Sequence, residues 1–256
     1  MRVLTLLCLC GLLAAPVLAD WPDHWVKWDQ LGPIDNYGAA SWINGPLDPG
    51  GTAFTADDYL CSGLPEDRYV TDIEFWGFSQ YGSQYIDQFR ITFWDDVPET
   101  PDDSSHPGNL LHEYYAQLAD PGDPLKLGWQ EIEDSHFKID IPEEFWFDQG
   151  VGEERVLWIG IQGVMVEDGF SDAFYWYFRE RHEPTWGDDA AFESEYFGYM
   201  PWWSWGSPTG YADPDLYEYI LPTGWTSLDM SFRLTCFPEP SALLLLGLGV
   251  LALSRR

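Results

Sequence analysis

Pairs of neighbouring carboxylates are the residues of this sequence that are best suited to chemistry. A glycosidase needs two carboxyl groups roughly 5–9 Å apart, one on each side of the glycosidic bond. Spacing along the chain does not set that separation, and among 43 acidic residues many pairs arise by chance. A carbohydrate-active hydrolase is therefore the alternative hypothesis, and no residue is predicted to be catalytic. The pairs are Asp57–Asp58, Asp95–Asp96, Asp102–Asp103, Glu143–Glu144, Glu153–Glu154 and Asp188–Asp189.

Calcium is the one cofactor that these acidic segments suggest. It takes carboxylate and carbonyl oxygens as ligands, often from flexible loops. The EF-hand pattern is absent, so such a site would be irregular, and solvated acidic loops are the competing interpretation. The first candidate group lies in a Pro-rich loop expected after a strand, and the second lies in a later loop. They are Asp95, Asp96, Asp102 and Asp103, and then Asp188 and Asp189.

The sequence lacks the common catalytic signatures. It contains no G-x-S-x-G, no G-x-x-x-x-G-K and no H-E-x-x-H motif. The pair His112 and Glu113 is followed at the position of a second zinc ligand by Ala116. These observations favour a binding or structural protein over an enzyme.

An aromatic run between Tyr196 and Tyr211 suggests a binding surface. Trp202, Trp203 and Trp205 are too close together for all three to enter one core. The face of an indole ring stacks well on the C–H face of a sugar, which predicts glycan binding. The competing interpretation is a loop that folds back over the body and buries its rings, because exposed aromatic patches without a function are uncommon.

Charge limits the partners of the central body, Asp20 to Phe237. Removing Glu239 from the 43 acidic residues, and Arg2, Arg255 and Arg256 from the 12 basic ones, leaves the body with a formal charge of −33. This charge excludes nucleic acid as a natural partner and repels anionic lipids and polysaccharides. Cations and neutral glycans remain suitable. The 44 aromatic residues argue against disorder, because disordered acidic chains contain few aromatic side chains.

Apolar and polar residues alternate along several segments, which predicts half-buried strands. Breaker-rich loops separate these segments, and helical periodicity is absent. The pattern predicts an all-β, antiparallel sandwich or jelly-roll-like body formed by a single domain. The expected strands are Ala53 to Leu60, then segments around Ile73 and Phe75, Phe89 to Phe93, Phe137 to Ile141, Leu157 to Ile161, Phe174 to Arg179 and Met230 to Leu234.

The N-terminus is typical of a secretory signal peptide. Arg2 supplies the positive charge, Val3 to Val17 is largely apolar, and Ala19 ends a stretch of small residues suited to cleavage. We therefore expect residues 1–19 to be removed.

Two cysteines, Cys61 and Cys236, remain after that cleavage. An even pair in an oxidising compartment predicts one disulfide, which would close a loop of about 175 residues. Two buried thiols are the alternative, because the sequence does not show the geometry that a disulfide needs.

Three parts follow one another in a fixed order at the C-terminus. They are the signature Pro238, Glu239 and Pro240, the apolar run Ala242 to Leu253, and the basic pair Arg255 and Arg256. This order resembles the PEP-CTERM sorting signal of bacterial envelope proteins. The resemblance implies export, and processing by an exosortase-type enzyme as partner.

The apolar run is short for a permanent membrane anchor. Twelve helical residues span roughly 18 Å, whereas the hydrocarbon core of a bilayer is about 30 Å thick. To span the bilayer, this run requires local thinning of the membrane and basic residues that extend to the membrane surface. A helix packed on the body is the weaker alternative, because the run has no polar face.

Four blocks of the body resemble an uncharacterised β-domain of exported PEP-CTERM proteins in planctomycete-like bacteria. The blocks are ADDYLC (Ala56 to Cys61), FRITFWDDVPETPDDSSHPGNLLHEYY (Phe89 to Tyr115), HEPTWGDDAAFE (His182 to Glu193) and SLDMSFRLT (Ser227 to Thr235). The resemblance supports the fold class and the domain division 1–19, 20–237 and 238–256. It implies no activity.

These observations predict an exported protein, anchored in the envelope or released to the extracellular matrix. We expect a non-enzymatic binding or structural module. Its expected partners are the sorting enzyme, the membrane through residues 238–256, and extracellular polysaccharide.

Overall fold

The computed structural model of the chain describes residues 26–30, 38–43, 52–100, 105–120, 127–166, 173–180, 190–194, 199–204 and 228–236. The described elements are strands and three short 3-10 turns, η2 (Pro65–Asp67), η3 (Ser83–Tyr85) and η4 (Glu143–Phe145), so the all-β class is confirmed. The expected signal peptide, the C-terminal segment and several candidate residues lie outside these ranges. Those residues are Asp102, Asp103, Asp188, Asp189 and Trp205.

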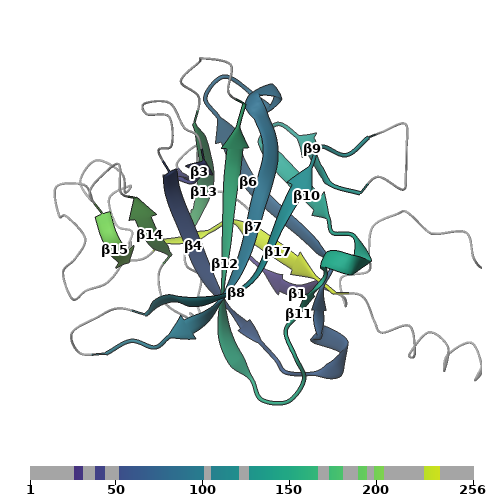
Figure 1. The fold of residues 1–256 in the computed structure, drawn as a ribbon, viewed down its shortest axis with the longest axis vertical. Coiled ribbons are helices and arrows are strands. Elements are labelled where there is room, and N and C mark those ends of the chain that lie inside the picture. The colour runs from purple at the N-terminus through teal and green to yellow at the C-terminus, as the bar shows by residue number, and fades with distance from the viewer. Residues whose placement is uncertain are drawn as a thin grey trace, which may run out of the picture.

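Seven of the described strands form one sheet in the order β15-β14-β4-β3-β12-β7-β8 (Figure 1). Their bounds are β3 (Trp42–Ile43), β4 (Thr52–Cys61), β7 (Ile86–Val97), β8 (His106–Gln117), β12 (Arg155–Met165), β14 (Ala191–Ser194) and β15 (Tyr199–Ser204). The short β3 runs parallel to β12, while the other pairings described in this sheet are antiparallel. The sheets are thus mainly antiparallel, as expected, with parallel pairing between β3 and β12 and at the isolated bridge of Leu118 and Trp129.

Eight further described strands form a second, antiparallel sheet. Its main path is β1-β17-β6-β10-β9, and β13 pairs with β6, β2 and β16. The bounds are β1 (Val26–Asp29), β2 (Gly38–Ala40), β6 (Asp72–Ser79), β9 (Trp129–Glu133), β10 (His136–Asp140), β13 (Phe174–Glu180), β16 (Leu228–Met230) and β17 (Phe232–Thr235). A separate small pair joins β5 (Tyr69–Val70) to β11 (Phe147–Asp148).

The two large sheets share one hydrophobic core. Alternate residues of each strand point into it, and aromatic side chains contribute much of its volume. The rings of Phe75 on β6 and Phe89 on β7 meet edge to face across the core, with their centroids 5.0 Å apart. Gly163 on β12 allows a close approach, because a Cβ there would lie 2.5 Å from Cβ of Phe174 on β13.

Each expected strand lies in a described strand, with small changes at the ends. Ile141 falls just beyond β10, and Ser231 separates β16 from β17. Two expected loops are wrong in part. Asp95 and Asp96 belong to β7, because this strand stays paired with β8 through Val97. The segment Tyr199–Ser204, expected to be a loop, is strand β15, paired with β14.

Candidate functional site

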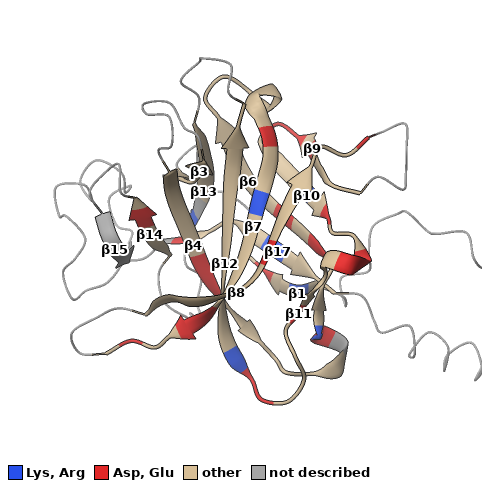
Figure 2. Cartoon of the chain, in the orientation of Figure 1, with Lys and Arg blue, Asp and Glu red and all other residues tan. Residues whose placement is uncertain are grey.

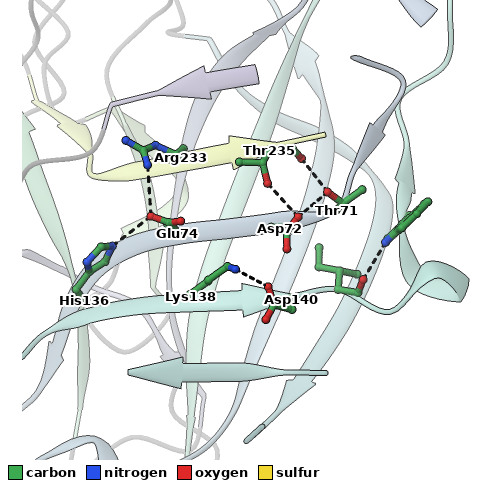
Figure 3. A network of polar contacts seen from close by, with 10 residues as sticks. Thr71, Asp72, Glu74, His136, Lys138, Asp140, Arg233 and Thr235 are labelled. Atoms are coloured by element: carbon green, nitrogen blue, oxygen red, sulfur yellow. Dashed lines mark hydrogen bonds and ion pairs between the residues drawn. The ribbon is translucent and has the colours of Figure 1, made fainter. Parts of the chain in front are cut away.

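A polar network covers the outer face of the eight-stranded sheet, which we define as the face turned away from the core. The strand period of two directs Ile73 and Phe75 of β6 into the core and Asp72, Glu74 and Trp76 outward. Neighbouring strands add further outward side chains at the same level (Figure 3). These are His136, Lys138 and Asp140 from β10, and Arg233 and Thr235 from β17.

Glu74 is the centre of one half of this network. Its Oε2 lies 3.6 Å from Nη1 of Arg233 and 3.6 Å from Nε2 of His136, so it bridges β17 and β10. The nearby imidazole of His136 lowers the pKa of Glu74, with a further contribution from Arg233, and together they outweigh the opposing effect of burial. Nη2 of Arg233 also lies 3.0 Å from Oδ2 of Asp29 on β1. Close contacts between charged or ionisable side chains therefore connect the four strands β1, β17, β6 and β10.

A pair of carboxyl groups forms the other half. Asp72 and Asp140 are cross-strand partners, so their side chains lie next to each other on the outer face. Oδ2 of Asp72 also accepts hydrogen bonds from the hydroxyls of Thr71 at 2.6 Å and Thr235 at 3.1 Å. Burial, reinforced by the neighbouring carboxyl group of Asp140, raises the pKa of Asp72 to about 7. Lys138 places Nζ 2.9 Å from Oδ1 of Asp140 and partly offsets the negative charge of the pair.

One member of this carboxyl pair is buried and already hydrogen-bonded within the protein. Two catalytic carboxyl groups stand roughly 5–9 Å apart, so that a glycosidic bond and its nucleophile fit between them. Asp72 is only 7% exposed, and its Oδ2 already accepts hydrogen bonds from Thr71 and Thr235. The bond from Thr235 joins β6 to β17.

Aromatic rings continue the outer face beyond the charged groups. The rings of Trp76 and His136 stack 4.4 Å apart at an angle of 10°. Further along β6, Phe78 stacks on Tyr175 of β13 at 4.9 Å and lies 5.4 Å from the ring of Tyr177. Trp76, Phe78 and Tyr175 are half-buried, so each ring still presents surface to solvent. The face thus combines ring surface with hydrogen-bonding groups.

The acidic pair Asp57 and Asp58, noted in the sequence, has a structural position. Asp57 is 1% exposed, and its Oδ2 accepts a 2.8 Å hydrogen bond from the backbone N–H of Met230 on β16. Burial, with the nearby carboxylates of Asp229 and Asp58, raises the pKa of Asp57 well above its usual range. The hydrogen bond from Met230 connects β4 of the seven-stranded sheet to β16 of the eight-stranded sheet.

The predicted calcium ligands that the structure describes already have partners. Asp95 accepts hydrogen bonds from the backbone and the side chain of Asn109, the latter at 2.8 Å. Asp96 accepts one from Nε1 of Trp158 at 2.9 Å. No three His, Cys, Asp or Glu residues in the described ranges are arranged to hold a metal ion. Figure 2 shows acidic residues distributed over many strands and turns of the body.

The other sequence candidates are only partly described. Trp202 and Trp203 lie on β15, although their side chains are not described. Cys61 and Cys236 are both buried, and their sulfurs are not bonded to each other in the structure. The outer face described above was not predicted. Its signal was the set of polar residues that alternate with the core residues of β6, β10 and β17, but the sequence did not show which strands are neighbours.

Comparison with known families covers nearly all of the described body. A family model described as a domain of unknown function, DUF7901, matches residues 26–235. The chain belongs to the DUF7901 family. In this DUF7901 protein the match begins with β1 and ends with β17, so both large sheets belong to the family domain. No curated protein and no solved structure matches the chain.

The remaining C-terminal segment carries a second match. Residues 238–256 match the PEP-CTERM protein-sorting motif, which confirms the resemblance seen in the sequence. This motif implies export, sorting to the cell surface and processing by an exosortase. Among the described residues, no helix has both the length and the apolar character to cross a bilayer.

Proposed function

We propose that this DUF7901 protein is a non-enzymatic β-sandwich, jelly-roll-like in shape, that binds neutral polysaccharide at the cell envelope or in the extracellular matrix. The observation that carries the proposal is the stacked pair of Trp76 and His136, which lies beside the Glu74–Arg233 ion pair on an outward sheet face. A half-exposed ring offers an apolar surface for the C–H face of a sugar. The ionic groups beside it offer donors and acceptors for hydroxyl groups.

The charge of the protein supports a neutral ligand. A body with a formal charge of −33 repels anionic polymers. On the outer face, Arg233 and Lys138 offset the carboxylates of Glu74 and Asp140. A neutral glycan therefore reaches this face without the repulsion that an anionic one meets.

Four predictions from the sequence are retained within the proposal. The signal peptide at 1–19 is removed, and the short apolar run at 242–253 contacts the membrane before the sorting enzyme acts. The tryptophans at 202, 203 and 205 extend the glycan surface, and calcium binds the acidic loops at Asp102 and Asp103 and at Asp188 and Asp189.

Affinity electrophoresis of the purified body tests the ligand class. Gels that contain neutral soluble polysaccharides should retard the protein, whereas gels with anionic polysaccharides at the same concentration should not. A body that migrates identically in all gels would contradict the proposal.

A further inference from the structure

The two cysteines of the body converge on one lysine and one aspartate. Cys61 ends β4 in the seven-stranded sheet, and Cys236 directly follows β17 in the eight-stranded sheet. Nζ of Lys27 lies 4.0 Å from Sγ of Cys61, and Oδ1 of Asp67 lies 3.7 Å from Sγ of Cys236. Lys27 also donates a hydrogen bond to the backbone carbonyl of Asp67. The four residues therefore form one cluster.

Strand pairing explains why residues so distant in the sequence meet. Val26 is the cross-strand partner of Thr235, so Lys27 and Cys236 each neighbour one member of this pair, on opposite sides of it. Asp67 reaches the cluster from η2, the turn that follows β4, and Ser62 donates a hydrogen bond to its Oδ2. The strand β1, the end of β17 and the end of β4 thus meet at one point between the two large sheets.

The cluster is largely closed to solvent. Cys61 is 1% and Cys236 is 6% exposed. Burial lowers the pKa of Lys27, while attraction to Cys61, Asp67 and Cys236 opposes that change. The field of this one ammonium group therefore acts on both sulfurs. A neighbouring cation favours a thiolate, which is the form that attacks disulfides.

We propose that Cys61 and Cys236 form a disulfide after export and that this disulfide joins the two large sheets. Lys27 accelerates its formation. The sequence suggested the pairing, and the geometry adds Lys27 and Asp67 as its electrostatic partners. This inference is independent of the glycan proposal.

The oxidant is a disulfide compound of the envelope. The Cys61 thiolate attacks one sulfur of that disulfide, and the other sulfur leaves as a thiolate. Cys236 then loses its proton toward Asp67 and attacks Sγ of Cys61, which expels the second oxidant sulfur. Overall, two cysteine thiols lose two electrons and two protons, and the oxidant disulfide is reduced to two thiols.

Non-reducing peptide mapping of the protein purified from the envelope tests the bond itself. The expected result is one peptide pair joined through Cys61 and Cys236, with neither thiol available to alkylation after denaturation. Reduction should then lower the melting temperature by about 10 °C, because a long loop is released in the unfolded state. Complete alkylation of both thiols in the envelope protein would overturn the proposal.

The role of Lys27 is tested by the rate at which the reduced full chain is oxidised by glutathione disulfide at neutral pH. Lys27→Met should slow disulfide formation about tenfold, and Lys27→Arg should restore most of the rate because it keeps the charge. Circular dichroism confirms that each variant is folded, and if Lys27→Met is unfolded, Lys27→Gln replaces it in the comparison. Equal rates for the wild type and a folded uncharged variant would overturn the role of the lysine.

Discussion

Trp76 and His136 stack nearly parallel on neighbouring strands, with ring centroids 4.4 Å apart and an angle of 10° between the rings. Trp76 on β6 and His136 on β10 are cross-strand partners. The preceding outward residue of β6 is Glu74, which lies close to His136. A fixed ring pair beside charged groups is already ordered before a ligand arrives. Little additional conformational entropy is then lost when a sugar packs on it.

Because Asp72 is buried and its pKa is raised, we expect the free energy of unfolding to fall as the pH rises toward neutrality. Its pKa in the folded protein is about 7, above that of the unfolded chain, so the folded state binds more protons between pH 4 and 7. Stability from this residue is therefore complete below about pH 4 and is lost as the pH passes through 7, by up to roughly 4 kcal/mol. Asp72→Asn should flatten the profile in urea unfolding, whereas Asp134→Asn, at an exposed turn, should leave it unchanged. An unchanged slope in Asp72→Asn would contradict the assignment.

The ion pair of Glu74 and Arg233 should show measurable coupling. Its carboxylate is partly exposed, so solvent screening limits the coupling energy to roughly 0.5–1 kcal/mol. The pKa of Glu74 is lowered, so its contribution is present at neutral pH and is lost as the pH falls through that lowered value. A double-mutant cycle with Glu74→Gln and Arg233→Met, measured by urea unfolding at pH 7 and pH 3, tests both statements. Additive effects at pH 7 would show that the pair contributes nothing.

The sequence predicted these strands because the alternation of apolar and polar residues is a local property of each segment. Ile73, Phe137 and Phe232 all lie in strands and in the core, as their alternation indicated. The outer network was not predicted, because it depends on which strands become neighbours, and Glu74 and Arg233 are far apart in the chain.

Local composition misled the prediction at Asp95 and Asp96. Prolines suggested that Asp95 and Asp96 lie in a loop, yet β8 accommodates Pro107 opposite Asp96. A strand at the edge of a sheet tolerates proline, because its free side needs no hydrogen-bond partner. Apolar and polar residues alternate only weakly in the Pro-rich segment, so the sequence does not predict how far the pairing of β7 with β8 extends.

Calcium should raise the melting temperature of the body more than sodium does at equal ionic strength. An ion that binds only the folded state stabilises it by roughly 2.7 kcal/mol at a hundredfold excess over its dissociation constant. Asp102→Asn with Asp103→Asn, and separately Asp188→Asn with Asp189→Asn, should remove the calcium-specific part of the shift. Asp95 and Asp96 are not substituted in this test, because their carboxylates already accept hydrogen bonds from Asn109 and Trp158. Identical shifts with both salts would contradict a specific site.

The sorting motif predicts the ends of the mature protein. Mass spectrometry of the released form should detect neither Met1 to Ala19 nor the peptide from Leu243 to Arg256. Replacement of Pro238, Glu239 and Pro240 by alanine should leave the tail attached and the protein in the membrane fraction. An intact tail on the released wild-type protein would contradict processing by the exosortase.

Isothermal titration of a neutral polysaccharide into the body and its Trp76→Ala variant is the most direct test of the proposed binding face. Loss of one aromatic contact of roughly 0.5–1.5 kcal/mol should weaken binding by up to about tenfold. Tyr115→Ala, which removes an exposed ring from β8 in the other sheet, should leave the affinity unchanged. Equal affinity of a folded Trp76→Ala variant and the wild type, or no binding by either, would contradict the account.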